Sequence, residues 1–138
     1  MSTPINKAIF LFDNGESEKA VELLEGYIAS REKMTYKTIN AYETLIDFKE
    51  QMGMEYSSEL LMLEKLDEDD ISGHTFFRLG LHYEKAGNNE KATDYFKLYT
   101  ERVNDPEQFA ETLGFADKWL RVKKDYFSFE AQDKTDLY

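Results

Sequence analysis

The sequence predicts an all-α protein. Two observations lead to this class, the amino-acid composition and the spacing of the glycines and apolar residues. The chain has 138 residues but only 7 glycines and 2 prolines, whereas a many-stranded β fold needs such turn residues about every ten positions. Aromatic residues make up 14% of the chain, enough large apolar groups to build a core and to argue against disorder. Glycines also recur at regular intervals along apolar segments with helical spacing. We therefore expect one domain built from repeated helix pairs.

The interval between glycines indicates the size of the repeat. Gly15, Gly53 and Gly87 each follow a segment with helical periodicity, and 34 residues separate the last two. The same interval separates Gly80 from Gly114, which both lie inside apolar helical patterns. Two sets of landmarks with one period predict units of two helices joined by a glycine-containing turn.

The first two helix pairs are expected over residues 3–30 and 36–67. Each has small or apolar residues at helical spacing on both sides of a turn glycine. These positions are Ala8, Leu11, Gly15, Ala20 and Leu24 in the first pair, and Tyr42, Leu45, Gly53, Ser58 and Met62 in the second. A longer connection between the pairs accounts for the 38 residues that separate their glycines.

The third pair, over residues 73–103, has the clearest pattern. Its first helix carries an apolar stripe at Phe76, Leu79, Gly80 and Tyr83, and its second helix carries Ala92, Tyr95, Phe96 and Tyr99 on one face. Gly87 is expected to end the first helix, because glycine tolerates the left-handed backbone conformation. The following Asp105-Pro106 closes the unit, since proline begins helices well and continues them badly.

The pattern Phe76-x-x-Leu79-Gly80-x-x-Tyr83, then Gly87, then Ala92-x-x-x-Phe96 resembles the tetratricopeptide repeat signature, with phenylalanine where tryptophan is commonest. The small residues Gly80 and Ala92 would let the paired helices approach closely.

The other two units depart from that signature at Lys7, Ile46 and Lys49. The resemblance implies a right-handed α-solenoid of three helix pairs. The apolar pattern after Pro106 predicts one uninterrupted capping helix over residues 107–127, and a polar tail follows over 130–138. A heptad coiled coil is the competing interpretation, but the glycines and Asn88-Asn89 would interrupt it.

The charge balance excludes several classes of function. Asp and Glu number 28 against 17 Lys and Arg, which gives a net charge of −11 and a pI near 4.6. Nucleic-acid phosphates and anionic membrane surfaces would be repelled, so we expect neither as a partner. The chain has no cysteine, and it begins without a charged leader and a long apolar run. We expect a cytoplasmic protein.

No constellation in the sequence predicts catalysis, a metal site or a cofactor. His74 and His82 are eight residues apart, about 12 Å along a helix, which is too far to share one metal ion. The acidic run over residues 67–70 lacks the glycine and the glutamate that a calcium loop needs at its sixth and twelfth positions. We expect this run to end one helix and to supply carboxylates to the start of the next.

The resemblance also implies a ligand groove, lined by the outward face of the first helix of each pair. The carried-over positions are Ile5, Ile9 and Phe12, then Glu43, Asp47 and Glu50, then His74, Phe77, Arg78 and Leu81, and finally Phe115, Lys118 and Trp119. Such a groove would be apolar toward its ends and acidic in its middle, which suits a basic or amphipathic partner. The alternative is that its apolar residues contact other segments of the same chain.

The sequence thus predicts a non-catalytic module, a small adaptor or scaffold that binds another protein or a peptide through the groove. A stand-alone acidic inhibitor, such as an antitoxin or an immunity protein that neutralises a basic enzyme, is the alternative. An enzyme or a sensor of small ligands is a third, less supported hypothesis. Apolar groove residues could also pair two copies of the chain in a homodimer.

Overall fold

A computed structural model describes residues 3–127, and the regular secondary structure of this part of the chain is all helical, with eight α-helices and no strand. The predicted all-α class is therefore confirmed for the described residues. The expected single domain divides into two compact units, a first unit that ends at Ile71 and a second unit that begins at Ser72. The predicted polar tail over 130–138 lies outside the described residues.

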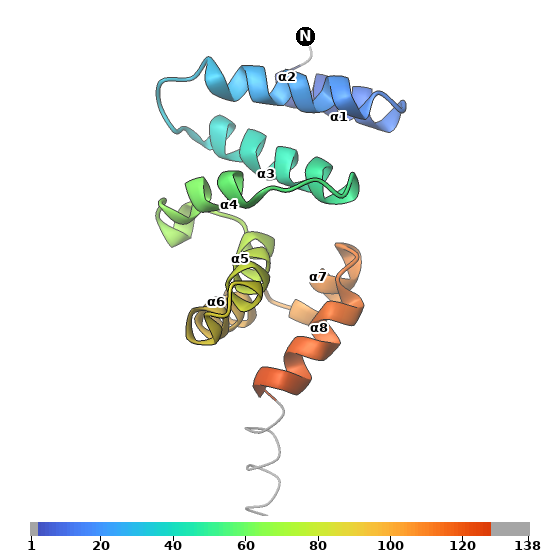
Figure 1. Cartoon of the computed structure of the whole chain (residues 1–138). Helices are drawn as coiled ribbons and strands as arrows, with labels where there is room; N and C mark the ends of the chain where they lie inside the picture. Colours follow the sequence, from blue (N-terminus) through green and yellow to red (C-terminus); the bar gives the residue numbers. More distant parts are fainter. Residues whose placement is uncertain (1–2, 128–138) are drawn as a thin grey trace, which may run out of the picture. The chain divides into compact units, whose positions relative to one another are not determined.

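The first unit contains four α-helices. They are α1 (Pro4–Asp13), α2 (Ser17–Ala29), α3 (Tyr36–Gln51) and α4 (Ser57–Glu64), followed by the short 3-10 helix η1 (Glu68–Asp70). Helix α1 packs against α2, both pack against α3, and α3 packs against α4 (Figure 1). This arrangement encloses a core on the inner faces of α1, α2 and α3.

The second unit contains four further α-helices. They are α5 (Gly73–Lys85), α6 (Asn89–Arg102), α7 (Pro106–Thr112) and α8 (Ala116–Val122), followed by the π-helical turn η2 (Lys123–Phe127). Helix α5 packs along α6, and α7 packs against α8. Helices α1 to α6 lie within the residue ranges expected for the three pairs. The right-handed solenoid and its assignment to the tetratricopeptide type stay predictions.

Local sequence determines where several helices begin. The Thr3 side chain caps α1 by accepting a hydrogen bond from the backbone N–H of Asn6 at 3.1 Å, and Pro4 occupies the first helical position. Asp105 and Pro106 do the same for α7, where the carboxylate accepts from a backbone N–H at 3.1 Å. These caps satisfy donors that the first turn of a helix leaves without partners.

The same type of turn joins the two helices in each of the four helical hairpins, α1–α2, α3–α4, α5–α6 and α7–α8. In each, a glycine with φ between 70° and 84° follows the first helix. Its backbone N–H and that of the next residue both donate back to carbonyls in the last turn of that helix, which is the Schellman motif. The four glycines are Gly15, Gly53, Gly87 and Gly114.

Gly114 contradicts the predicted uninterrupted helix over residues 107–127. Its φ is +80°, and the N–H of Phe115 donates to the carbonyl of Ala110 at 2.7 Å, so α7 ends there. The apolar periodicity on both sides of Gly114 belongs to two separate helices, and periodicity alone does not reveal the break. The segment is a fourth helical hairpin, followed by a π-helical turn.

We expect Gly114→Ala to lower the free energy of unfolding by about 1–2 kcal/mol, because a Cβ atom is strained in the left-handed region. Gly26→Ala is the matched control. Gly26 lies inside α2, and a Cβ atom there would meet nothing within 4 Å, so this change should stabilise by up to about 1 kcal/mol. Urea unfolding followed by circular dichroism measures both, and effects of the same sign would contradict the assigned turn.

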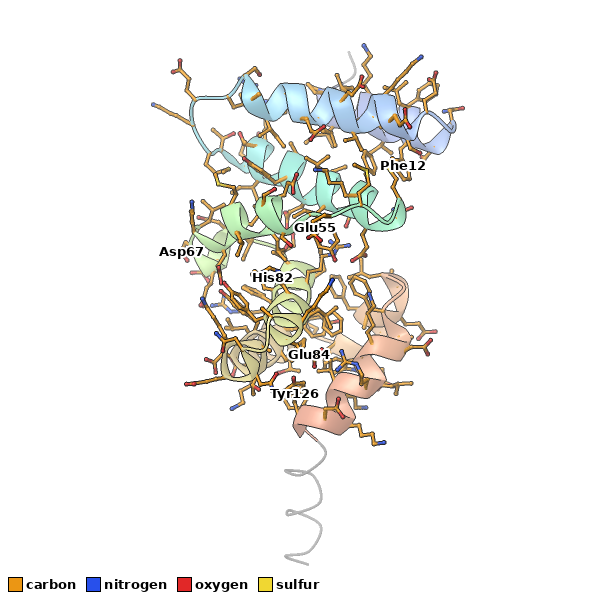
Figure 2. The ribbon with its side chains drawn as sticks, viewed as in Figure 1. Phe12, Glu55, Asp67, His82, Glu84 and Tyr126 are labelled. Carbon is orange, nitrogen blue, oxygen red and sulfur yellow. The ribbon has the colours of Figure 1, made fainter. Side chains whose placement is uncertain are left out.

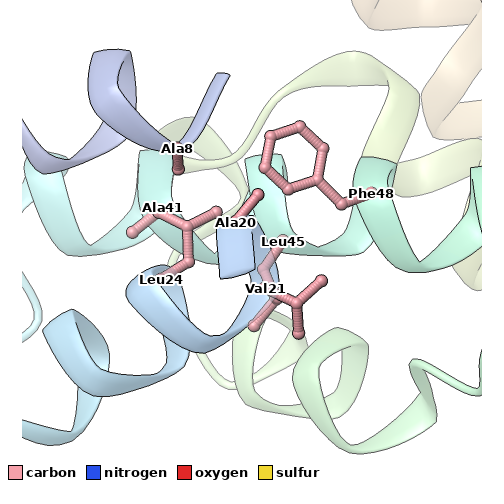
Figure 3. Close-up of a cluster of buried hydrophobic side chains, with 7 residues drawn as sticks. All are labelled: Ala8, Ala20, Val21, Leu24, Ala41, Leu45 and Phe48. Carbon is pink, nitrogen blue, oxygen red and sulfur yellow. The ribbon is translucent and has the colours of Figure 1, made fainter. Parts of the chain in front are cut away.

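The core of the first unit consists of small and aliphatic side chains together with the aromatic ring of Phe48 (Figure 3). Alanines at the contacts between α1, α2 and α3 let these helices approach closely, and larger side chains fill the space around them. The buried cluster between these three helices comprises Ala8, Ala20, Val21, Leu24, Ala41, Leu45 and Phe48. At its edge, the ring of Phe12 stacks on the ring of Phe48 with a centroid separation of 4.2 Å.

The core of the second unit is aromatic, and Phe77 lies at its centre. This ring is fully buried, and it contacts four other rings at centroid distances between 5.1 and 6.1 Å. Those rings belong to Phe96, Tyr99, Phe115 and Trp119. They come from α6, from the α7–α8 turn and from α8, so the fourth hairpin completes the core of the third.

Helices α5 and α6 pack closely because Gly80 has no side chain. A Cβ atom at this position would lie 2.4 Å from the buried ring of Phe96, well inside van der Waals contact. This is the close approach that the repeat pattern predicts for the small residue of the first helix.

Candidate functional site

In the first unit, the residues predicted to line the groove differ widely in exposure. Ile9 is exposed, while Ile5 and Phe12 pack partly against the core. On α3, Glu43 is buried and its neighbours Asp47 and Glu50 are half-buried. The predicted acidic middle of the groove is therefore less accessible to solvent than its sequence position suggested.

In the second unit, the predicted exposure of the three large aromatic groove residues is wrong. Phe77, Phe115 and Trp119 are each at least 96% buried, and the ring of Phe77 contacts the rings of the other two within the unit. The physical reason is the turn at Gly114, which directs α8 back onto α5 and α6. The alternative stated above, that these residues contact other segments of the chain, describes them correctly.

The remaining predicted groove residues of the second unit have mixed surroundings. Arg78 is buried, with its guanidinium carbon 5.3 Å from the centroid of the Phe115 ring. Lys118 is exposed, and its ammonium group lies 5.2 Å from the same ring. His74 and Leu81 are half-buried. These residues lie at the border of the aromatic core, and they do not line an open apolar surface.

The first unit contains an open pocket between α2 and α4, which we call the α2–α4 pocket. Its volume is about 250 Å³. Its lining consists of two carboxylates, a hydroxyl, a phenol and several apolar side chains. Residues of α3 contribute to this lining between α2 and α4. The lining residues are Glu25, Ile28 and Ala29 from α2, Tyr42 and Leu45 from α3, and Ser58, Glu59 and Met62 from α4.

A buried lysine connects the two carboxylates of the pocket. The side chain of Lys49 is only 9% exposed, and its ammonium group forms ion pairs with Glu59 and with Glu25, the latter at 3.5 Å. Glu59 also accepts a hydrogen bond from the Ser58 hydroxyl at 3.0 Å. The three charged side chains come from three different helices, so the cluster ties α2, α3 and α4 together.

Burial and pairing act in opposite directions on these groups. Burial is the largest single influence on Glu59 and would raise its pKa, but the hydrogen bond and charge of Lys49, a backbone hydrogen bond and the Ser58 hydroxyl together hold that pKa below the ordinary value of 4.5. Burial alone would lower the pKa of Lys49, but Glu59 and Glu25 together raise it above the ordinary value of 10.5. Both groups therefore stay charged at neutral pH.

Because of the ion pair between Lys49 and Glu59, we expect the stability of the fold to fall at both low and high pH. The contribution of Glu59 to the free energy of unfolding is present above pH 4.5, and it is lost as the pH falls through the lowered pKa of Glu59 in the folded protein. The contribution of Lys49 is present below pH 10.5 and is lost as pH rises through its raised folded pKa. We expect these losses in urea-unfolding free energies measured on the native chain. The variant with Lys49→Met and Glu59→Gln is the control, and an identical pH dependence in that variant would contradict the assignment.

The pocket carries more negative than positive charge. Two carboxylates face one ammonium group, and a row of exposed carboxylates on α2 leads to the pocket. Glu18, Glu22 and Glu25 are spaced by four and three residues and so share one face of that helix. A cationic group is the complementary ligand for this surface.

A second charged cluster, in the second unit, has a structural role. Arg121 donates to both carboxylate oxygens of Glu84 at 2.7 Å, and the Tyr126 hydroxyl donates to the same carboxylate at 2.8 Å (Figure 2). Burial and this carboxylate raise the pKa of Tyr126 to about 12. The cluster joins η2 and α8 to α5, and all of its groups have partners within it.

Sequence reasoning did not find the α2–α4 pocket, although one signal pointed toward it. Lys49 occupies a position where the repeat signature has a core tyrosine, and a buried ammonium group requires carboxylate partners. Sequence spacing alone did not show which of the many acidic residues would supply them. The pocket also lies between the second helices of two pairs, whereas the predicted groove belongs to the first helices.

Within residues 3–127, no group of three or more acidic or histidine side chains is placed to hold a metal ion. The helices of the same range are too short or too polar for any of them to cross a bilayer.

Comparisons with models of known protein families, with curated proteins and with solved structures each found no match for this chain.

Proposed function

We propose that this protein is a non-catalytic binding module, built from tetratricopeptide-like helix pairs, that binds a cationic segment of a partner protein. The observation that carries the proposal is the α2–α4 pocket, which combines an apolar wall with an excess of carboxylate charge. Its volume of about 250 Å³ is below the range of about 300–1,000 Å³ typical of pockets for small-molecule ligands. A partner's side chain suits this volume better than a metabolite does.

The net charge of −11 supports the same class of partner. Long-range attraction accelerates the encounter of oppositely charged proteins, and salt weakens it. The exposed carboxylates of α2 would attract a basic segment toward the pocket. An adaptor or scaffold that holds such a segment is the leading form of the proposal.

A neutralising inhibitor of a basic enzyme, such as an antitoxin or an immunity protein, is the second candidate. The row Glu18, Glu22 and Glu25 favours it, because an extended acidic surface can cover a basic active site. The two candidates differ in what binding does to the partner. Under the inhibitor hypothesis, one equivalent of this protein abolishes the partner's enzymatic activity, whereas an adaptor leaves that activity in place.

The test begins with the partner isolated from the native cell and continues with both proteins purified. We expect the dissociation constant to rise at least 10-fold between about 50 mM and about 200 mM salt. Glu25→Gln should weaken binding more than Glu101→Gln, which makes the same change in charge at an exposed position on α6. Binding that is insensitive both to salt and to Glu25→Gln would refute the proposal.

A further inference from the structure

We propose that the α2–α4 pocket accepts the side chain of a single arginine from the partner protein. This inference rests on the proposed function, because it names the group through which the cationic segment is recognised. The aliphatic stem of the arginine would lie along the apolar wall, and the guanidinium group would bind the carboxylate of Glu25.

The shape and the lining of the pocket select a long side chain. The volume of about 250 Å³ equals the liquid volume of about eight water molecules at roughly 30 Å³ each. Ile28, Ala29 and Met62 provide an apolar wall against which methylene groups can pack. A short cationic group, such as a free ammonium ion, would leave this wall in contact with water.

The two carboxylates of the pocket, Glu25 and Glu59, differ in their exposure to solvent. The Glu59 side chain is 11% exposed and pairs with Lys49, whereas the Glu25 side chain is 51% exposed and pairs with the same ammonium group only at 3.5 Å. Glu25 can therefore accept further hydrogen bonds from a ligand. Lys49 balances one of the two negative charges, so the pocket offers one excess charge to a monovalent cation.

Arginine fits this lining better than lysine does. Its planar guanidinium group carries five donors and can bind a carboxylate through two parallel hydrogen bonds. It also stacks on aromatic faces, and Tyr42 contributes a half-buried ring to the pocket. The more strongly hydrated ammonium group of lysine loses more on leaving water.

The test uses the whole chain and a small probe, arginine capped as its N-acetyl methylamide. Amide chemical shifts of the ¹⁵N-labelled protein are followed as the probe is added. We expect saturable shifts at Glu25, Ala29, Ser58 and Met62 with a dissociation constant on the order of 1 mM. The capped lysine and the uncharged, nearly isosteric capped citrulline should each bind at least 10-fold more weakly.

Variants of the protein complete this experiment. Glu25→Gln should weaken binding of the arginine probe about 10-fold, because it removes the charge of the hydrogen-bonded partner. Glu101→Gln should leave binding unchanged. Equal binding of citrulline or lysine, shifts that lie elsewhere, or equal effects of the two substitutions would each overturn the inference.

The outcomes separate this inference from the proposed function. If the probe does not bind the pocket but the purified partner still binds in a salt-dependent manner, the arginine assignment fails and the proposed function stands. If the probe binds as described but no partner segment competes with it, the pocket's preference for arginine stands and the proposed function fails.

Discussion

Phe77→Ala is expected to destabilise the second unit by about 4 kcal/mol, in the range of large-to-small substitutions in protein cores. The ring is fully buried and contacts four other aromatic rings, so its removal leaves a cavity that none of its neighbours can fill without rearrangement. Urea unfolding followed by near-ultraviolet circular dichroism measures the loss. Hydrogen exchange should accelerate first in α5, α6 and α8.

Phe10→Ala is the matched control for this substitution. Phe10 lies on α1 with 67% of its surface exposed, so the same change should alter the unfolding free energy by no more than about 0.5 kcal/mol. Similar effects at the two positions would contradict the assigned aromatic core. The comparison also means that reduced partner binding by Phe77→Ala would report unfolding rather than loss of a surface contact.

Lys49→Ala is expected to destabilise the first unit by about 3 kcal/mol, because it leaves the carboxylate of Glu59 buried without its cation. The double variant Lys49→Met with Glu59→Gln should recover most of this loss, since no uncompensated charge remains. A double-mutant cycle on the unfolding free energy, built from Lys49→Met, Glu59→Gln and the double variant, should give a coupling of about 2 kcal/mol between the two side chains.

Lys37→Ala is the control for the loss of a lysine from α3. Lys37 lies near the start of that helix and is exposed, so its removal should change stability by less than about 0.5 kcal/mol. A coupling near zero between Lys49 and Glu59, or equal losses in the two lysine variants, would show that the ion pair does not stabilise the unit.

The helices were predictable from the sequence because their signals are local. Thr3, Pro4, Asp105 and Pro106 mark helix starts through hydrogen bonds and backbone geometry that involve only residues three or four positions away. The glycines of the first three turns, Gly15, Gly53 and Gly87, act over a similar distance. Such interactions form within one or two turns of helix, so the order of the residues is enough to reveal them.

The last helical hairpin was not predictable in the same way. Gly80 and Gly114 both follow a leucine within an apolar helical pattern. One lies inside a helix against the ring of Phe96, and the other has φ of +80° and ends a helix. The pattern around each glycine is the same, and only packing against the rest of the unit distinguishes them.

The candidate site was the least predictable feature. The sequence marked Lys49 only as a departure from the repeat signature, and its partners Glu25 and Glu59 lie on two other helices. The chain contains 28 acidic residues, and their spacing does not show which pair meets across α2 and α4. Conversely, Phe77, Phe115 and Trp119 were expected on a surface and lie in a core, because the turn at Gly114 brings them together.

The sequence by itself determined the all-α class, the ranges of helices α1 to α6 and the acidic character, since these follow from composition and from contacts along one helix. Tertiary structure alone decided which aromatic side chains are buried and where two carboxylates meet a buried lysine. Those features depend on contacts between helices that are distant in sequence, and the geometry of such contacts is set by how the whole unit packs.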